Sequence, residues 1–313
     1  MDPTGFARLM LRSAYYAGLG VLGLPALMRR FRAAGVVLCY HNVCSTGAAA
    51  RAGEPAVHLP VDRFAAQARW LARHYDVVPL RELVGRLEAG RPLRGLAAVT
   101  FDDGYAGVFT HAWPLLLELG LPATVFVVAD APDHHDAFWW DHPAVAHAAT
   151  PARRERWLTA LRGDGEGILG AATRPIAAPP LPLPPSHRPA DWGTIAAAAD
   201  AGLELGAHSA THRTLTQLDG PELEREIVSS REAVHARTRT RPAFFAYPYG
   251  LWDARVRDAV HSAGYRGAVT LDYGLVSAGT DAWTLRRVNI PAAITLPAFE
   301  AWAAGLRPRG RRP

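Results

Sequence analysis

Short apolar runs alternate with amphipathic stretches along most of the chain from residue 35 onward. Each apolar run is too short for a buried helix and predicts a strand. Between the runs, apolar residues recur at three- and four-residue spacing, which predicts helices with one buried face. The predicted strands cover residues 36–40, 76–80, 96–101, 123–128, 203–208, 243–248, 266–271 and 285–290, and the predicted helices cover 62–75, 81–90, 111–120, 192–202, 222–238, 254–264 and 297–306.

This alternation gives about seven strand–helix units, which is typical of a parallel sheet, either open or closed into a barrel. One segment interrupts the rhythm. Residues 174–189 contain seven prolines and therefore cannot form a helix or a central strand. We expect this segment to be an exposed loop or a lid. We find no internal repeat and no clear domain boundary.

The composition indicates a folded domain with basic ends. Hydrophobic residues make up 49% of the 313 residues and charged residues 20%, so a large core can form. The net charge of +5 is typical of a protein that binds an anionic membrane or glycan. The alternative is that the basic ends are solvated and bind nothing. The charge does not indicate nucleic-acid binding, because we find no helix-turn-helix, zinc finger or RNA-binding motif. The basic ends contain Arg29, Arg30, Arg32, Arg307, Arg309, Arg311 and Arg312.

An apolar, glycine-rich run over residues 14–28 precedes the first basic cluster. It contains Pro25 and is shorter than the roughly 20 residues that span a bilayer. The arginines follow the run, whereas a secretory signal has its basic residues before it. We therefore expect a cytoplasmic protein, of bacterial origin, that rests on the inner membrane through this segment. The two cysteines form no disulfide framework, and Cys39 lies in an apolar run that predicts burial.

The clearest chemical signal is "VTFDDGY", in which Asp102 and Asp103 follow the predicted strand 96–101. Adjacent carboxylates at the end of a buried strand are costly unless a cation or a proton lies between them. The carboxyl ends of parallel strands are also where α/β proteins build their sites. This pair therefore suggests a metal site, although a helix N-cap beside a solvated neighbour would leave a similar pattern.

Two further strands end in polar motifs. "HSATHRTL" follows strand 203–208 and places His208 and His212 four residues apart, so one helical turn would put both rings on one face. Two histidines and a carboxylate suit zinc or a similar divalent ion, although such a histidine pair can also lie on a surface. "PYG", residues 248–250, predicts a tight turn whose backbone N–H groups could face an oxyanion.

Together "TFDDGY", "HSATHRTL" and "AYPYG" resemble the first three motifs of the polysaccharide deacetylase family, the NodB homology or carbohydrate esterase family 4 proteins. The resemblance extends over residues 36–300 and includes "VLCYHNV", "LPATVFV", "WWD", "GLELGAHS" and "HSAGYRGAVT". It implies an α/β fold, a distorted (β/α)7 barrel of the NodB type in a single domain.

The resemblance also implies roles for individual residues. Asp103, His208 and His212 would hold one divalent metal, with Zn favoured and Co, Ni or Mn as alternatives. Asp102 would be the base that takes a proton from water. The turn of Pro248 and Tyr249 would stabilise the oxyanion through a backbone N–H.

The chain departs from the family pattern in two places. The arginine that commonly precedes the Pro-Tyr-Gly turn is replaced here by Ala246 or Tyr247, and we expect Arg287, rather than Arg286, to take its place. The late histidine that serves as general acid is missing, since no histidine follows Tyr265. Deacetylases of the poly-N-acetylglucosamine type resemble the chain in both respects, and they share the "YH" motif.

That motif places His41 at the end of strand 36–40, where we expect a general acid or a transition-state stabiliser. A structural histidine at a strand end is the alternative. We further expect Trp140 to stack on a sugar ring or to pack in the core. The expected domain organisation is an apolar and basic N-terminal segment 1–34 in peripheral contact with the membrane, a deacetylase domain 35–306 with the Pro-rich loop 174–189, and a basic tail 307–313.

The expected function is metal-dependent removal of N-acetyl groups from a sugar or polysaccharide in cell-envelope or exopolysaccharide synthesis. The expected partner is an N-acetylated glycan or a lipid-linked sugar. A deformylase of a lipid-linked amino sugar would use the same chemistry with a smaller pocket. A metal-containing carbohydrate-binding pseudoenzyme is the alternative from another class, and hydrolysis of a non-sugar amide is a third.

Overall fold

Seven parallel strands close into a barrel in a computed structural model that describes residues 13–47, 52–134, 136–172 and 183–307. The strand order around the barrel is β1-β11-β9-β8-β7-β6-β5, and β5 pairs with β1 again to close it. This confirms the distorted (β/α)7 barrel in a single domain. The barrel strands are β1 (Ala34–Tyr40), β5 (Leu96–Phe101), β6 (Thr124–Val127), β7 (Glu204–Ala207), β8 (Phe244–Ala246), β9 (Gly267–Tyr273) and β11 (Leu285–Asn289).

The barrel is uneven because its neighbouring strands pair over very different lengths. β1 and β5 are paired at five positions, whereas β7 and β8 share a single pair, Ala207 with Phe245. The register also shifts between β9 and β11. Short strands β4 (Asp76–Val77) and β10 (Val276–Ser277) extend the sheet beside β5 and β1, and β2 (Asn42–Cys44) pairs separately with β3 (His58–Pro60).

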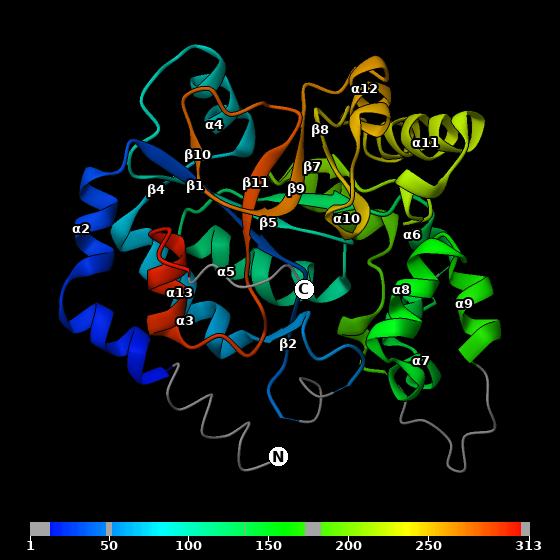
Figure 1. The fold of residues 1–313 in the computed structure, drawn as a ribbon, viewed down its shortest axis with the longest axis horizontal. Helices are drawn as coiled ribbons and strands as arrows, with labels where there is room; N and C mark the ends of the chain where they lie inside the picture. Colours follow the sequence, from blue (N-terminus) through cyan, green and yellow to red (C-terminus); the bar gives the residue numbers. More distant parts are fainter. Residues whose placement is uncertain (1–12, 48–51, 135, 173–182, 308–313) are drawn as a thin grey trace.

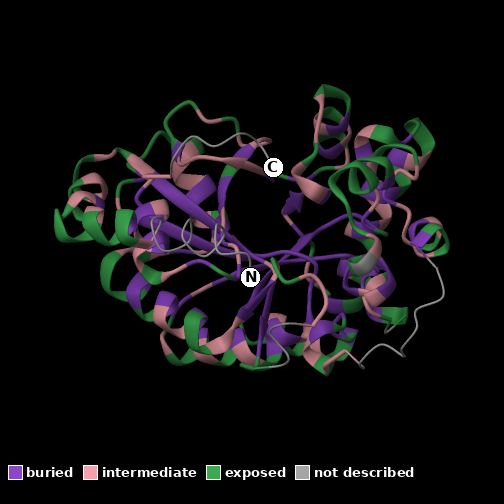
Figure 2. Ribbon diagram, turned by 60° about the horizontal axis from the view of Figure 1, so that its bottom comes forward, coloured by how far each residue is buried: buried purple, intermediate pink, exposed green. Residues whose placement is uncertain are grey.

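The core forms on both faces of the barrel wall because successive residues of a strand point to opposite sides. One cluster combines Val37, Ala98 and Val269 from three barrel strands with Leu83 of α4 (Leu80–Glu88), and fills the interior. Residues on either side of Val37 belong instead to the cluster beneath the outer helices. Figure 2 shows the strands as a buried centre and the exposed surface on the outer faces of the helices.

Helices surround the barrel, and all seven of the expected helices are found. α2, α3 and α13 lie on one side in Figure 1, and α10, α11 and α12 on the other. They are α2 (Leu24–Phe31), α3 (Val61–His74), α4 (Leu80–Glu88), a π-helical turn η2 (Val108–Ala112), α5 (Trp113–Glu118), α10 (Trp192–Asp200), η5 (Leu215–Gln217), α11 (Gly220–Thr238), η6 (Pro248–Gly250), α12 (Ala254–Ser262) and α13 (Leu296–Ala303).

A group of short helices between β6 and β7 was not expected from the sequence. Its helices are brief, and two of them begin at a proline, so no long amphipathic period reveals them. Figure 1 shows α7, α8 and α9 gathered at one corner of the barrel. The elements are α6 (Ala131–His134), η3 (Trp139–Asp141), α7 (Pro143–Ala148), α8 (Pro151–Thr159) and α9 (Gly165–Ala172).

The Pro-rich segment is only partly described, and its described end is not the exposed loop that we expected. Residues 173–182 lie outside the described residues. Pro185–His187 form a 3-10 turn, η4, and the His187 side chain is fully buried with its ring centroid 3.9 Å from that of His58. Pro189 pairs with Tyr105 as an isolated bridge. The prolines exclude a long helix or a central strand there, but they do not exclude burial of side chains.

Within the described residues, no helix combines the length and the apolar character needed to cross a bilayer.

Candidate active site

The polar motifs of the sequence meet at the carboxyl ends of the barrel strands. Asp102 and Asp103 follow β5, His41 follows β1, and His208 follows β7. They surround a pocket of about 140 Å³. Its lining residues are His41, Glu54, Val57, Asp102, Asp103, Trp139, Trp140, Arg154, Leu158, His208, His212, Tyr249 and Leu271.

Asp103, His208 and His212 converge on one point. Nε2 of His208 lies 3.1 Å from Nε2 of His212, and each nitrogen lies 3.5 Å from Oδ1 of Asp103. A point equidistant from three atoms so spaced lies about 2 Å from each, which is the distance of nitrogen and oxygen ligands from zinc. All three side chains are buried. Their spacing therefore fits a divalent metal, and these three residues form a candidate metal site.

The hydrogen bond of His208 supports the same conclusion. Nδ1 of His208 lies 2.8 Å from the carbonyl oxygen of Ala246, an atom that can only accept, so Nδ1 carries the proton. The lone pair is then on Nε2, which faces His212 and Asp103. Histidine ligands of metals are commonly oriented in this way by a carbonyl or carboxylate behind the ring.

The side chains of the candidate metal site have pKa values shifted by burial and by neighbouring charges. Burial, followed by the charges of Asp102 and Asp141, raises the pKa of Asp103 well above its ordinary value. Burial lowers the pKa of His208, and burial together with His208 holds the pKa of His212 well below its ordinary value. Neutral imidazoles keep their lone pairs available, as metal binding requires.

The two histidines do not share a helical turn, so that expectation was wrong. Residues 208–214 form a loop without helix. Ser209 and His212 both have φ near 61°, in the left-handed region that residues with a side chain rarely occupy. The Ser209 hydroxyl accepts a hydrogen bond from the His212 backbone N–H at 2.9 Å. These two left-handed residues fold the loop back and bring the rings together.

Left-handed backbone is concentrated at this site. Six described residues other than glycine have φ between 53° and 72°. Four of them are Asp103, Ser209, His212 and Tyr249. Such conformations cost of order 1–3 kcal/mol each and tend to cluster at active sites and ligand-binding positions. Their clustering here is independent support for a functional site.

Asp102 is held by a buried arginine. Nη1 of Arg287 lies 2.7 Å from Oδ1 of Asp102, and Nη2 lies 2.6 Å from Oδ2. Burial alone would raise the pKa of Asp102, but the Arg287 guanidinium and then His208 hold that pKa well below its usual range. Arg287 itself is fully buried in β11 and does not line the pocket, whereas Asp102 does.

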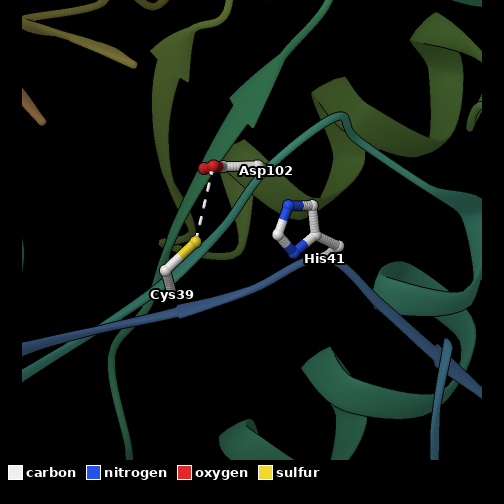
Figure 3. A group of neighbouring side chains, drawn as sticks. All are labelled: Cys39, His41 and Asp102. Carbon is white, nitrogen blue, oxygen red and sulfur yellow. Dashed lines mark hydrogen bonds between the residues drawn. The ribbon is translucent and has the colours of Figure 1, made fainter. Parts of the chain in front are cut away.

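Cys39 and His41 complete the surroundings of Asp102 (Figure 3). The Cys39 thiol donates to Oδ2 of Asp102 at 3.4 Å, and burial raises the pKa of that thiol well above its ordinary value. Ligand atoms of Cys39, His41 and Asp102 lie within 4.8 Å of one another. Because Arg287 already binds both carboxylate oxygens, this group suits proton handling better than a second cation.

His41 is half-buried and lines the pocket. Withdrawal from water lowers the pKa of His41 to about 4, although Asp102 opposes the shift. The ring is therefore neutral near pH 7.

The turn after β8 contacts the candidate metal site through Tyr249. Its hydroxyl donates to the backbone carbonyl of His212 at 3.0 Å, and its ring centroid lies 4.5 Å from that of His212. Pro248 is buried in the turn and does not line the pocket. Among the described residues, none accepts a hydrogen bond from the Tyr249 backbone N–H.

Trp140 forms part of the pocket wall, with its ring centroid 4.7 Å from that of His212. It also stacks on Phe138 at 4.7 Å, so it both packs and faces the pocket. Its indole N–H donates to the Tyr105 hydroxyl at 2.6 Å. The contacts with Phe138 and Tyr105 thus fix the orientation of the Trp140 ring in the pocket wall.

The orientation of Trp140 depends in turn on Asp141, for which the sequence pattern predicted no role. Its carboxylate accepts hydrogen bonds from the Tyr105 hydroxyl at 2.7 Å, from Nε2 of His58 at 2.8 Å and from the Glu54 backbone N–H at 2.8 Å. Nδ1 of His58 accepts in turn from Asn42 at 2.9 Å. The only signal in the sequence was the place of Asp141 in "WWD".

The pocket rim was also missed. Glu54 and Arg154, which both line the pocket, form an ion pair at 2.8 Å. Leu158 and Leu271 contribute apolar surface to the pocket wall. These four residues come from three segments far apart in the chain, with Arg154 and Leu158 both on α8, and they belong to none of the motifs. Only the folded barrel brings them together.

Comparison with known proteins agrees with this geometry. The family model described as polysaccharide deacetylase matches residues 89–268. The Bacillus subtilis protein YxkH, named as a polysaccharide deacetylase, is 19% identical over 273 residues, which cover 87% of this chain and 76% of that protein.

Two solved structures have a similar fold. The Streptococcus pyogenes deacetylase PplD, in complex with acetate, superposes with a TM-score of 0.61 at 17% identity, covering 84% of this chain and 95% of that one. IcaB from Ammonifex degensii superposes with a TM-score of 0.59 at 22% identity, covering 87% of this chain and 98% of that one. Since the family match extends over more than half of the chain and includes the Asp102–Asp103 and His208–His212 motifs, the chain belongs to the polysaccharide deacetylase family, the hydrolases that cleave amide bonds of N-acetylated sugar polymers.

Proposed function

We propose that the protein is a divalent-metal-dependent deacetylase that removes the N-acetyl group from a sugar residue of a glycan, in cell-envelope or exopolysaccharide synthesis. The observation that carries the proposal is the convergence of Asp103, His208 and His212 beside a separate buried carboxylate, Asp102. Zinc suits a site of two imidazoles and one carboxylate. When bound, such an ion supplies a Lewis acid that makes water more acidic and polarises a carbonyl.

Asp102 is suited to accept the proton of the attacking water. Its Oδ2 carries bonds from both Arg287 and Cys39, whereas Oδ1 carries one from Arg287. We therefore assign the incoming proton to Oδ1. Arg287 keeps the carboxylate ionised until that step and fixes its direction.

His41 is better suited to stabilise the transition state as a neutral ring than to act as a general acid in the imidazolium form. A ring with a pKa of about 4 carries no proton to donate from the imidazolium at neutral pH. It can instead donate a neutral N–H hydrogen bond into the pocket. The backbone N–H of Tyr249, which has no acceptor among the described residues, is a second donor for developing negative charge on the acetyl oxygen.

The shape of the site suits a polymer. The pocket accommodates an acetamido group and part of one ring. A groove of about 510 Å³ adjoins it and shares Tyr249 and Leu271. Trp252 and Trp302 line this groove with flat apolar surface that suits sugar rings. Neighbouring residues of the glycan would lie along it.

The test is acetate release from N-acetylglucosamine oligomers of increasing length by metal-reconstituted protein, with Asp102→Asn alongside. We expect release that increases with oligomer length, and loss of activity in Asp102→Asn with its metal still bound. Release of formate from an N-formyl sugar in place of acetate would reassign the substrate. No release of either acid, with stoichiometric metal and measurable glycan binding, would instead indicate a binding protein.

A further inference from the structure

Exposed large apolar side chains are concentrated in one short part of the chain. Among the described residues, eight large hydrophobic side chains are exposed, and five of them lie between residues 15 and 31. Isolated exposed apolar residues are ordinary in folded proteins, but a contiguous group indicates an interaction surface. The five are Tyr15, Val21, Leu22, Leu27 and Phe31.

These residues lie in two consecutive helices within residues 13–31, which we call the apolar hairpin. Residues 13–21 are helical, Gly23 turns the chain with φ near 67°, and α2 follows. Val21 and Leu22 lie at the tip, 89% and 74% exposed. Leu27 and Phe31 are four residues apart and therefore share the outer face of α2. In Figure 1 the hairpin is the dark blue pair of helices at the edge of the barrel.

The opposite face of the hairpin is anchored, so the exposure belongs to an ordered element. Tyr16 is buried, and its hydroxyl accepts a hydrogen bond from the Trp302 indole at 2.7 Å. The Arg29 guanidinium lies 4.9 Å from the centre of the Trp70 ring. Nη1 of Arg32 donates to the Gly305 carbonyl at 3.1 Å. The hairpin is thus fixed to the barrel while its tip projects into solvent.

The charges of the segment identify the kind of surface that fits it. Residues 13–34 contain three arginines and no aspartate or glutamate. Arg30 is exposed beside Phe31. An apolar wedge flanked by cations matches the interface of an anionic bilayer, where apolar side chains enter the acyl region and arginines remain among the headgroups. A second copy fits less well, because two Arg30 side chains would meet without an acidic partner on either hairpin.

We propose that the apolar hairpin docks the protein onto the surface of an anionic lipid bilayer, with Val21 and Leu22 entering the membrane and Arg30 at the headgroups. Trp302 links this surface to the active site, because it holds Tyr16 on one side and lines the groove beside the pocket on the other. Docking would therefore place the groove close to the membrane, where a glycan attached to lipid is within reach.

The experiment measures partition of the full chain onto vesicles of phosphatidylcholine, with and without phosphatidylglycerol, by co-sedimentation. We expect binding that increases with phosphatidylglycerol content and weakens with salt. Replacing Val21 and Leu22 together by serine should lower the partition coefficient by about tenfold or more, because two exposed apolar side chains no longer enter the acyl region. Arg30→Gln should reduce the preference for phosphatidylglycerol and its salt dependence.

Leu117→Ser is the matched control, since Leu117 is 49% exposed on α5, outside the hairpin. It should bind vesicles as the wild type does. Equal partition of the hairpin variant and the control would overturn the proposal, as would absence of wild-type binding. A wild-type dimer that the serine variant converts to monomer without vesicles would assign the surface to a second copy instead. Vesicle binding needs no turnover, so the result is independent of the deacetylation chemistry proposed above.

Discussion

Arg287 and Asp102 form a two-fold hydrogen-bonded ion pair inside the barrel, with N···O distances of 2.7 and 2.6 Å. The two residues are 185 positions apart in sequence. Nε of Arg287 also donates to the Thr270 carbonyl at 2.9 Å, which fixes the plane of the guanidinium. The planar guanidinium, fixed in this way, donates two hydrogen bonds to the carboxylate at once, which the single ammonium group of a lysine cannot do in the same geometry. The pair therefore determines both the charge and the direction of Asp102.

Removing the guanidinium should leave Asp102 as a buried charge without compensation. We expect Arg287→Met to lower the free energy of unfolding by about 3–5 kcal/mol. Adding Asp102→Asn to that variant should recover part of the loss, because no unpaired charge remains. Chemical denaturation measures both. Arg286→Met, at the exposed neighbour in the same strand, is the control, and an equal loss there would contradict the assignment.

The candidate metal site should bind one divalent ion and stabilise the fold in doing so. At free metal a thousandfold above its dissociation constant, linkage predicts about 4 kcal/mol of stabilisation. We expect His212→Gln to lose both the bound metal, measured by elemental analysis, and the rise in Tm on adding zinc. His261→Gln, at an exposed position on α12, should keep both. Unchanged metal content in His212→Gln would exclude this site.

Asp141 should support the pocket from behind. Its carboxylate accepts three hydrogen bonds, and an asparagine would turn an N–H₂ group toward at least one of those donors. We expect Asp141→Asn to cost about 1–3 kcal/mol of stability and to raise KM as Trp140 loosens. Near-UV circular dichroism and steady-state kinetics report the two effects. Asp133→Asn, which breaks an exposed pair with Arg237, should change stability by less than about 1 kcal/mol.

His41 should make the fold sensitive to mild acid. Its pKa is lowered from 6.5 to about 4 in the folded protein, so between these values the unfolded chain binds the proton and the folded chain does not. The stability contribution is complete above pH 6.5 and is lost as the pH falls through 4. The difference amounts to about 1–3 kcal/mol. His41→Gln, compared with wild type in metal-free buffer from pH 7 to about 4, should flatten this part of the curve; parallel curves would contradict it.

Much of the fold and part of the site followed from sequence pattern. The apolar runs at 36–40 and 96–101 predicted β1 and β5 because a fully buried strand needs an uninterrupted apolar sequence. Polar motifs directly after those runs predicted a site at the strand ends. The residue types then indicated the chemistry, since adjacent carboxylates and a histidine pair suit a cation. All of these are local properties, encoded within a few residues of chain.

Tertiary structure decided which of those groups meet and how they are oriented. Barrel closure through β1 and β5 brings His41 beside Asp102, and β11 inserts Arg287 from near the far end of the sequence. The histidine pair converges through the left-handed residues Ser209 and His212, and not through the helical turn that its four-residue spacing predicted. Asp141 acquires its partners from two separate segments, residues 54–58 and the turn at Tyr105. Sequence spacing carries no information on such contacts, because they exist only once the strands have closed and excluded water.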